Sequence, residues 1–393
     1  MHILSEVSAV YDDVVALRRE FHAHPELSEH EAETEKRIAA YLDKIGVPYV
    51  RGVAGHGLVA TLGTGKEPAV GIRADIDALP ILEETKLPYA SENPGVMHAC
   101  GHDVHTAALL GTATVLKKFE KEIPGTVRLF FQPAEETVGG AKGMIDEGYM
   151  ENPHVSRMLG LHVQPTIPWD VVEVPLGKMN AATCEVVIRV KGVACHGAHP
   201  EKGVDAILVS SHIVVALQSI SSRFFAPTTP VIVTLGIING GAKENIIAGE
   251  VTMRGTLRAL ENGVMARVKE LVRRTAEETA KAYGATAEVT LNDGYPALVN
   301  DRETSLLVAE TVKELYGEKK LAYMDEPSLG ADDFAYFANA AKGCYFNIGT
   351  LTTADQPAQS LHSETFAPDE RALGVAVAVE VAGALKLLEE EAK

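Results

Sequence analysis

The sequence predicts an α/β protein, with a mostly parallel mixed sheet, helices on both of its faces, and an inserted ferredoxin-like α+β domain. Strand-like and helix-like segments alternate before residue 181 and after residue 295, which is typical of a parallel sheet enclosed by helices. Between these points the segments follow the order βαββαβ of a ferredoxin-like unit. The 393 residues, 46% of them apolar, suffice for two hydrophobic cores. We therefore expect one domain from residues 1–181 and 295–393, and a second from residues 182–294.

The first domain should begin with two helices, one on each side of Pro25. In the second helix Ile38, Tyr41 and Ile45 recur at helical spacing, and Gly46 marks its end. The following elements alternate. They are strands at 57–63 and 69–77, a helix at 104–118, a strand at 126–131, a helix after Gly140, and strands at 157–163 and 170–174.

The inserted domain has a clear alternation of strand and helix patterns. The expected elements are strands at 183–192, 230–240, 249–260 and 286–294, and helices at 205–222 and 264–284. The first domain then resumes with a helix at 302–317 and a sheet strand at 343–350, and the acidic tail 387–393 reads as a solvated helix end. The chain therefore leaves the first domain and returns to it.

Charge and composition exclude several classes of partner. The net charge is −18, from 36 basic and 54 acidic residues, and such a surface repels nucleic acid and anionic membranes. No run approaches the roughly 18 apolar residues of a membrane span, and the N-terminus has no secretory pattern. The four cysteines are scattered, which favours free thiols in a reducing compartment. We expect a cytoplasmic protein that binds neither nucleic acid nor membrane.

Metal-binding side chains follow several of the predicted strands. They are Cys100 and His102 in "MHACGHDVHTAALL", Glu135 and Glu136 in "FFQPAEET", His162 in "GLHV" and His362 in "SLHSETF". Sites in open α/β sheets form beyond the carboxyl ends of the strands, so these groups should meet. Thiolate, imidazole and carboxylate ligands suit Zn²⁺, Mn²⁺, Ni²⁺ or Co²⁺.

Spacing suggests how these residues divide the work. In an extended chain residues i and i+2 point the same way, so Cys100 and His102 should face one site. Adjacent residues point apart, so one of Glu135 and Glu136 can hold a metal while the other accepts a proton from water. Each signal alone is weak, because a strand histidine is usually structural and a glutamate pair is usually solvated. The occurrence of all these side chains at predicted strand ends of one sheet supports a metal site.

Nine stretches, in order along nearly the whole chain, resemble a known family. They are "LRREFHAHPELSEHE", "GIRADIDALPI", "GVMHACGHDVHTAALLG", "LFFQPAEE", "GGAKGMIDEG", "GLHV", "GAHP", "ENII" followed by "GTLR", and "GADDFAYF". The family comprises zinc- or manganese-dependent amidohydrolases and exopeptidases. It includes aminoacylases, hippurate hydrolase, thermophilic carboxypeptidases, auxin-conjugate hydrolases and N-acetyldiaminopimelate deacetylase.

The resemblance implies a site for two divalent metal ions. Its implied ligands are Cys100, His102, Glu136, His162 and His362. It further implies that Glu135 is the general base and that Asp77 orients a ligand. His196, from the inserted domain, would stabilise the oxyanion, often across a dimer. Asn245 and Arg258 would hold the carboxylate of the substrate, for which the planar fork of arginine is well suited.

Some positions depart from the family pattern or have no implied role. Asp75 stands where relatives outside this subgroup carry a metal-binding histidine, and we do not count it as a ligand. Cys195 replaces the usual glycine beside His196 and would narrow the pocket. Asp103 is expected to orient a neighbour or to cap the following helix. His98 and His105 are expected to be structural.

The activity that follows is hydrolysis of the amide bond of N-acyl amino acids, such as N-acetyl or N-benzoyl derivatives. Alternatives are a metallo-carboxypeptidase or dipeptidase acting on short peptides, and a non-catalytic metal- or ligand-binding homologue. A cysteine hydrolase using Cys100 and His102 is disfavoured, because that spacing suits a nucleophile and its base poorly. We expect a homodimer that pairs through the helix 205–222, with the inserted domain as a hinged lid that brings His196 to an active site.

Overall fold

The computed structural model describes residues 2–353 and 359–393, and the chain divides into two compact units. Unit 1 comprises Met1–Gly177, Asn300–Glu326 and Asp333–Lys393, and unit 2 comprises Lys178–Val299 and Pro327–Asp332. The expected insertion, 182–294, lies within unit 2. Unit 2 also includes the short return segment 327–332, for which the sequence carries no local signal.

Unit 1 is built on an eight-stranded mixed sheet in the order β1-β2-β4-β3-β5-β16-β6-β15. The strands are β1 (Tyr49–Val53), β2 (Gly57–Gly63), β3 (Ala69–Asp75), β4 (Thr126–Gln132), β5 (Val155–Pro168), β6 (Val172–Val174), β15 (Leu321–Tyr323) and β16 (Lys342–Leu351). The central strands β4, β3, β5 and β16 are mutually parallel, whereas β2 and β6 pair with this group antiparallel. The parallel centre places four carboxyl ends at one edge.

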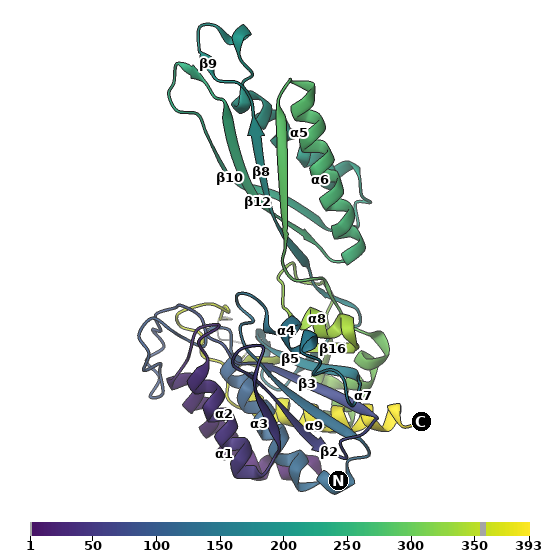
Figure 1. Ribbon diagram of the computed structural model, residues 1–393. Helices are drawn as coiled ribbons and strands as arrows, with labels where there is room; N and C mark the ends of the chain where they lie inside the picture. Colours follow the sequence, from purple (N-terminus) through teal and green to yellow (C-terminus); the bar gives the residue numbers. More distant parts are fainter. Residues whose placement is uncertain (1, 354–358) are drawn as a thin grey trace. The chain divides into compact units, whose positions relative to one another are not determined.

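Helices cover both faces of this sheet, as the sequence predicts (Figure 1). One face carries α1 (Ile3–Ala23), α2 (Ala32–Ile45), α3 (His102–Lys118), α7 (Arg302–Tyr316) and α9 (Ala372–Glu391), and the other carries α4 (Gly140–Asp146) and α8 (Phe334–Ala340). Neighbouring residues of β5 show the two layers: Leu159 lies against Gly383 of α9, and Gly160 lies against Phe334 of α8. The α/β fold class is confirmed.

Unit 2 has the expected βαββαβ order. Its antiparallel sheet, in the order β10-β12-β8-β13, consists of β8 (Ala182–Lys191), β10 (Val231–Gly240), β12 (Glu250–Ala259) and β13 (Thr286–Asp293). The helices α5 (Ala206–Arg223) and α6 (Asn262–Ala282) pack against the sheet. Two small ladders complete the unit: β9 (Cys195–His196) with β11 (Ile246–Ile247), and β7 (Lys178–Asn180) with β14 (Leu298–Val299).

Helix α5 is apolar along most of its length. By length and composition it is the one helix in the described part of the chain that could span a membrane. One side of α5 nevertheless belongs to the core of unit 2, through Val209, Ile213 and Leu217, all buried. Its other side is exposed and includes Val215, whose side chain is 72% exposed. This division is that of a core helix with an uncovered apolar side.

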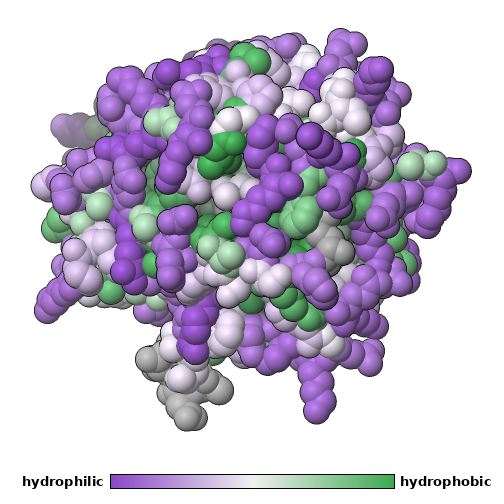
Figure 2. All heavy atoms as spheres, turned by 90° about the horizontal axis from the view of Figure 1, so that it is seen from below, coloured by the Kyte–Doolittle hydropathy of each residue, from purple (hydrophilic) through white to green (hydrophobic). Residues whose placement is uncertain are grey.

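Several short elements were not expected from the sequence, namely β1, β7, β9, β11, β14, β15 and α8. They contain two to seven residues, too few for a hydrophobic period to be recognised. Of helix α9 only the acidic end was expected, because its interior is apolar on nearly every side and shows no amphipathic pattern. The face of the molecule seen in Figure 2 is mostly hydrophilic, with apolar residues scattered among the polar ones.

Candidate metal centre and active site

The candidate site lies at the carboxyl ends of the parallel strands of unit 1. Cys100 lies near the end of the segment between β3 and α3, His102 is the first residue of α3, and Glu135 and Glu136 follow β4. His162 lies within β5, two positions beyond Gly160, where the pairing of β5 with β3 ends. His362 follows β16, and its backbone N–H donates to the carbonyl of Ala99 at 2.8 Å. The fold therefore brings all four segments to one edge.

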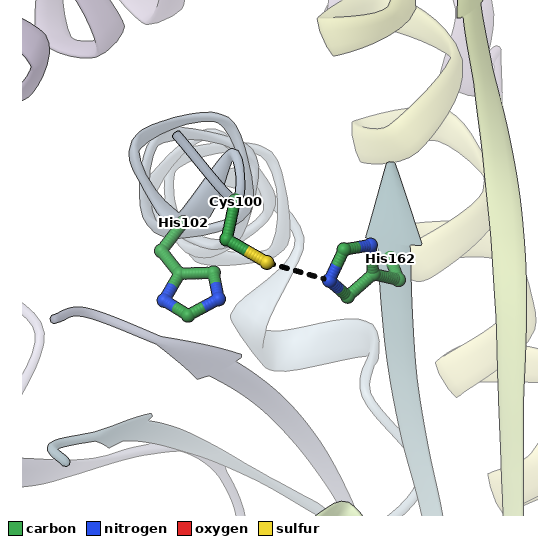
Figure 3. A group of neighbouring side chains, drawn as sticks. All are labelled: Cys100, His102 and His162. Carbon is green, nitrogen blue, oxygen red and sulfur yellow. Dashed lines mark hydrogen bonds between the residues drawn. The ribbon is translucent and has the colours of Figure 1, made fainter. Parts of the chain in front are cut away.

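Cys100 and His102 converge, but not by the extended geometry expected from their spacing. Gly101 between them has a φ of 86°, and His102 is already the first residue of α3, two positions earlier than expected. A side chain at Gly101 would lie 2.4 Å from Val163 Cγ2, so this turn requires glycine. Cys100 Sγ lies 3.4 Å from Nε2 of His162, and the two side chains and His102 gather in one place (Figure 3).

Asp77 fixes the ring of His102. The imidazole Nδ1 of His102 lies 2.9 Å from the backbone oxygen of Asp77 and 3.2 Å from its Oδ1, so Nδ1 carries the proton. In the neutral ring His102 Nε2 then has the free lone pair, and it lies 3.9 Å from Glu136 Oε1. Against the effect of burial, Asp75 and other neighbours raise the pKa of His102 well above its usual value, so a bound cation would have to displace a proton from Nε2. The other oxygen of Asp77, Oδ2, accepts from the Ser28 hydroxyl at 2.6 Å and from the Glu136 N–H at 3.0 Å. Asp77 therefore contacts both a candidate ligand and the backbone of Glu136, which is the kind of contact that fixes the orientation of a ligand.

The two glutamates differ in their surroundings. Glu136 Oε1 lies 3.3 Å from Nε2 of His362. Burial favours the protonated form of Glu136, but His362 and His102 outweigh it and lower its pKa. Glu135 is buried, and one of its oxygens lies within 4.8 Å of ligand atoms of both His102 and Glu136. Glu136 thus faces the histidines as an anion, with Glu135 beside it.

The donors fit a divalent metal centre. Three overlapping groups have all their ligand atoms within 4.8 Å of one another: Cys100–His102–His162, Cys100–Glu136–His362 and His102–Glu135–Glu136. His102 Nε2 is buried and makes no hydrogen bond to any residue that the structure describes, and Glu136 Oε1 is buried with Nε2 of His362 at 3.3 Å. Burial raises the pKa of the Cys100 thiol well above its usual range, so a bound cation would have to displace that proton. Imidazole nitrogens and a carboxylate that converge beside a thiol are the donor set that a borderline metal ion prefers.

The comparisons with known proteins identify the family of this chain. Residues 71–384 match the model of the peptidase family M20/M25/M40. The chain belongs to this family. Thermostable carboxypeptidase 1 of Saccharolobus solfataricus is 38% identical over 374 residues, 94% of each chain. N-acetyl-L-cysteine deacetylase of Bacillus subtilis is 37% identical over 369 residues, 93% of this chain and 86% of the relative.

A solved structure supports the same assignment. A dinuclear metal-binding M20 peptidase from Bacillus subtilis superposes with a TM-score of 0.85 at 33% identity, covering 97% of this chain and 99% of that one. Membership of the M20/M25/M40 family makes the chain a hydrolase of the amidohydrolase type. The expected family resemblance is confirmed, and the groups above are the candidate metal-ligand groups of this M20 hydrolase.

Asp75 lies next to the centre of this M20 hydrolase, with its Oδ2 3.6 Å from Nε2 of His102, and it has two closer partners. Its carboxylate bonds Arg73 Nη1 at 2.6 Å and His105 Nδ1 at 2.6 Å, which holds the pKa of Asp75 well below its usual range against the effect of burial. His105 Nε2 accepts the N–H of Val163 at 3.0 Å, so both ring nitrogens of His105 are engaged. Since His162 Nδ1 in turn bonds the Val163 carbonyl at 2.8 Å, this network holds the strand that carries His162.

Of the two roles expected for Asp103, to orient a neighbour or to cap α3, the structure contradicts the cap and agrees with the first. The Asp103 carboxylate is buried and bonds Arg18 Nε and His22 Nδ1, each at 2.8 Å, which ties α3 to α1. Despite burial, these two partners lower the pKa of Asp103 strongly. His98 is also buried, and neither of its ring nitrogens bonds any described residue. Burial lowers the pKa of His98 to about 4, so its ring is neutral.

The candidate residues of unit 2 lie at two places. His196, on β9, pairs with Ile246, and the N–H of Gly197 bonds the carbonyl of Asn245 at 2.8 Å, so His196 and Asn245 are neighbours. The ring of His196 is exposed, and its Nδ1 accepts from the Ala198 N–H at 3.0 Å. Arg258 lies near the far end of β12, where its Nη1 donates to the carbonyl of Leu329 at 3.3 Å.

Proposed function

We propose that this M20 hydrolase cleaves the amide bond of N-acyl amino acids, with two divalent ions held by the five donors Cys100, His102, Glu136, His162 and His362. The observation that carries the proposal is the convergence of these donors in overlapping groups at one edge of the sheet, with Glu135 within 4.8 Å of His102 and Glu136. Divalent ions at such a site supply Lewis acidity toward the scissile carbonyl and lower the pKa of water. The resident ion is proposed to be Mn²⁺, Zn²⁺, Ni²⁺ or Co²⁺.

Glu135 is the proposed general base. It accepts a proton from the attacking water and passes it to the departing amine nitrogen. Burial of Glu135 beside the ligands keeps it close to the reacting atoms and away from bulk water. Asp77 holds His102 in one tautomer throughout. His196 is proposed to donate to the oxyanion, and Asn245 and Arg258 to bind the free carboxylate.

The positions of these residues in unit 2 support a homodimer. Glu250 pairs with Lys191 at one end of β12, near β9 and β11, whereas Arg258 pairs with Thr183, close to the entry of the chain into unit 2. From residue 250 to residue 258 a strand extends about 26 Å. One N-acyl amino acid is far shorter, so His196 and Arg258 of the same chain cannot both hold it. We propose that each active site uses His196 and Asn245 of a second copy.

The uncovered side of α5 is the proposed pairing surface. Ile207, Leu208 and Val215 on α5 are 47%, 49% and 72% exposed, and Ile237 and Ile238 on the edge strand β10 are also exposed. Burial of such a surface stabilises an interface by about 25 cal/mol per Å² of apolar area. Unit 2 would then act as both the dimerisation domain and the lid.

The four cysteines are free, as expected for the cytoplasm, where we propose that the enzyme acts.

A peptidase is the second candidate, favoured by the similarity to thermostable carboxypeptidase 1. Both candidates bind a free carboxylate beside an amide, so Arg258 does not distinguish them. The two differ only in what occupies the acyl side of the bond.

A substrate screen tests the proposal. The purified protein is stripped with a chelator and reloaded separately with Mn²⁺, Zn²⁺, Co²⁺ and Ni²⁺. It is then assayed with N-acetyl amino acids, N-benzoyl amino acids and dipeptides, with Glu135→Gln as the inactive control. We expect the fastest turnover with an N-acyl amino acid. Turnover of dipeptides alone would select the peptidase, and full activity after chelation would overturn metal dependence.

A further inference from the structure

The segment between α1 and α2 contains a family-like motif, "PELSEHE", to which the proposed mechanism assigns nothing. In the structure this segment lies against the chain around Asp77 and Ala78, which follows β3. Leu27 forms a parallel bridge with Ala78, and the Ala78 N–H donates to the carbonyl of Glu26 at 2.8 Å. The segment thus runs along the chain that carries Asp77.

Ser28 is the first contact from this segment to the site. Its hydroxyl donates to Asp77 Oδ2 at 2.6 Å, and the same oxygen accepts the backbone N–H of Glu136 at 3.0 Å. Asp77 therefore holds the peptide group that follows Glu135. Ser28 fixes the orientation of the carboxylate that makes this contact.

Glu31 is the second contact. Its Oε1 accepts the backbone N–H of Ala134 at 2.8 Å, across 103 positions of sequence. Ala134 has a φ of 57°, a left-handed conformation that a non-glycine residue adopts only at an energetic cost. The carboxylate of Glu31 thus holds a strained turn directly before Glu135.

The surroundings of Glu31 are unfavourable for a carboxyl group. The residue is 0% exposed, no described Lys, Arg or His forms an ion pair with it, and its Oε2 makes no hydrogen bond to the described residues. Burial raises the pKa of Glu31 to about 7. A buried polar atom without a hydrogen-bond partner destabilises the folded state, so an apolar residue at this position would favour stability more. A carboxyl group kept in such a place points to a role other than stability.

We propose that Glu31 is a positioning residue for Glu135. Glu31 and Asp77 bind the backbone N–H groups of residues 134 and 136, one on each side of Glu135, and so fix the direction in which Glu135 enters the site. The inference rests on the proposed function of Glu135 as the base. A displacement of about 1 Å at a reacting group can cost on the order of 10²-fold in rate, so loss of one holding contact should appear in turnover.

The test compares three replacements of Glu31 in the metal-loaded, full-length enzyme. Glu31→Gln keeps an acceptor for the Ala134 N–H and should keep kcat within about 3-fold of wild type. Glu31→Asp withdraws the acceptor by one methylene, and Glu31→Leu removes it; both should lower kcat by roughly 10–100-fold. KM and the metal content per subunit should stay at the wild-type values in all three, because no ligand or carboxylate-binding residue is touched.

Glu35 provides the matched control. It is also a buried glutamate of the same region, but its Oε1 accepts from the Gly52 N–H at 3.1 Å and from Arg51 Nε at 3.0 Å. These partners belong to β1 and not to the loop that contains Glu135. Glu35→Leu should lower the melting temperature and leave kcat per folded, metal-loaded subunit unchanged. A structural role for Glu31 would give the same pattern as this control.

The possible outcomes distinguish a failure of the positioning role of Glu31 from a failure of Glu135 as the general base. Kinetics are measured on whichever amide in the substrate screen is hydrolysed fastest, with Glu135→Gln in parallel. If Glu135→Gln retains turnover, the assignment of the base has failed. If Glu135→Gln is inactive while Glu31→Asp matches wild type in kcat, the positioning inference is overturned. Should Glu31→Leu not fold, the contrast between Glu31→Gln and Glu31→Asp decides alone.

Discussion

At the scale of single residues, adjacent carboxylates have different partners and should behave differently when changed. Glu136 faces His362 and His102, whereas Glu135 stands beside them. Glu135→Gln should keep the fold and the metals and lose turnover by roughly 10²–10⁴-fold, the usual worth of a general base. Glu136→Gln should instead lose metal. Elemental analysis and kcat, measured on the same samples, check both, and exchanged phenotypes would reverse the two roles.

Glu380 on α9 makes a residue-scale prediction about stability. Its side chain is fully buried, its Oε2 accepts from the Thr112 hydroxyl at 2.6 Å, and its Oε1 has no hydrogen-bond partner among the described residues. Burial raises the pKa of Glu380 from 4.5 to about 8. The folded state therefore binds a proton that the unfolded state releases above pH 4.5. This stabilisation is complete below pH 4.5 and is lost as the pH rises through about 8.

Glu380→Gln removes this titration while keeping the shape of the side chain. The free energy of unfolding of the wild type should fall by a few kcal/mol relative to that of the variant between pH 5 and pH 8, and the difference should level off above pH 8. Urea unfolding across this range measures it. Parallel pH profiles for the two proteins would show that Glu380 does not titrate in this window.

At the scale of elements, the four parallel strands β4, β3, β5 and β16 explain how residues distant in sequence form one site. Their carboxyl ends meet at one edge, and each strand delivers or precedes a donor. Turns beyond these strand ends then set the direction of the side chains. The positive φ of Gly101 lets Cys100 and His102 face the same site, and the positive φ of Ala134 directs the chain toward Glu135. His362, also with positive φ, closes the group from the loop after β16.

Helix α5 makes the prediction that belongs to this scale. Val215 is 72% exposed on the uncovered side of α5, the proposed pairing surface. Val215→Glu should convert the dimer to monomer, because it places a charge where apolar area would be buried. Sedimentation velocity measures the change. Leu82→Glu, at a residue of unit 1 that is 63% exposed, is the matched control and should leave the assembly intact; equal effects of the two would exclude α5 as the interface.

At the scale of the whole molecule, the proposed dimer assigns His196 to the active site of the partner. His196→Ala and Glu135→Gln should each be inactive alone, with both metals still bound in His196→Ala. After subunit exchange, a mixed dimer contains one site with intact Glu135 and intact His196. Activity should therefore return to about a quarter of the wild-type value in an equal, statistical mixture. No recovery after verified exchange would restrict His196 to its own chain or to no role.

The sequence by itself determined the class of the fold and the chemistry of the centre. Period-two and helical patterns in long segments reveal strands and helices, because each element must bury one face. The motifs that contain Cys100, Glu135 and His162 are local, so their residue types can be recognised without the fold. Family membership followed from such stretches and is confirmed. Short strands and the nearly uniformly apolar helix α9 lack a period and were missed.

Only the tertiary structure decided which partner each side chain meets. Asp103 looked like a helix cap because Arg18, its partner, is 85 positions away. Cys100 and His102 converge through a left-handed glycine, which their spacing alone does not reveal. Glu31 bonds Ala134, which is 103 residues away in the sequence, and no local sequence pattern predicts that contact. Hydrogen bonds and charge pairs act over a few ångströms, and sequence separation does not determine which groups come that close; the packing of the sheet and its helices does.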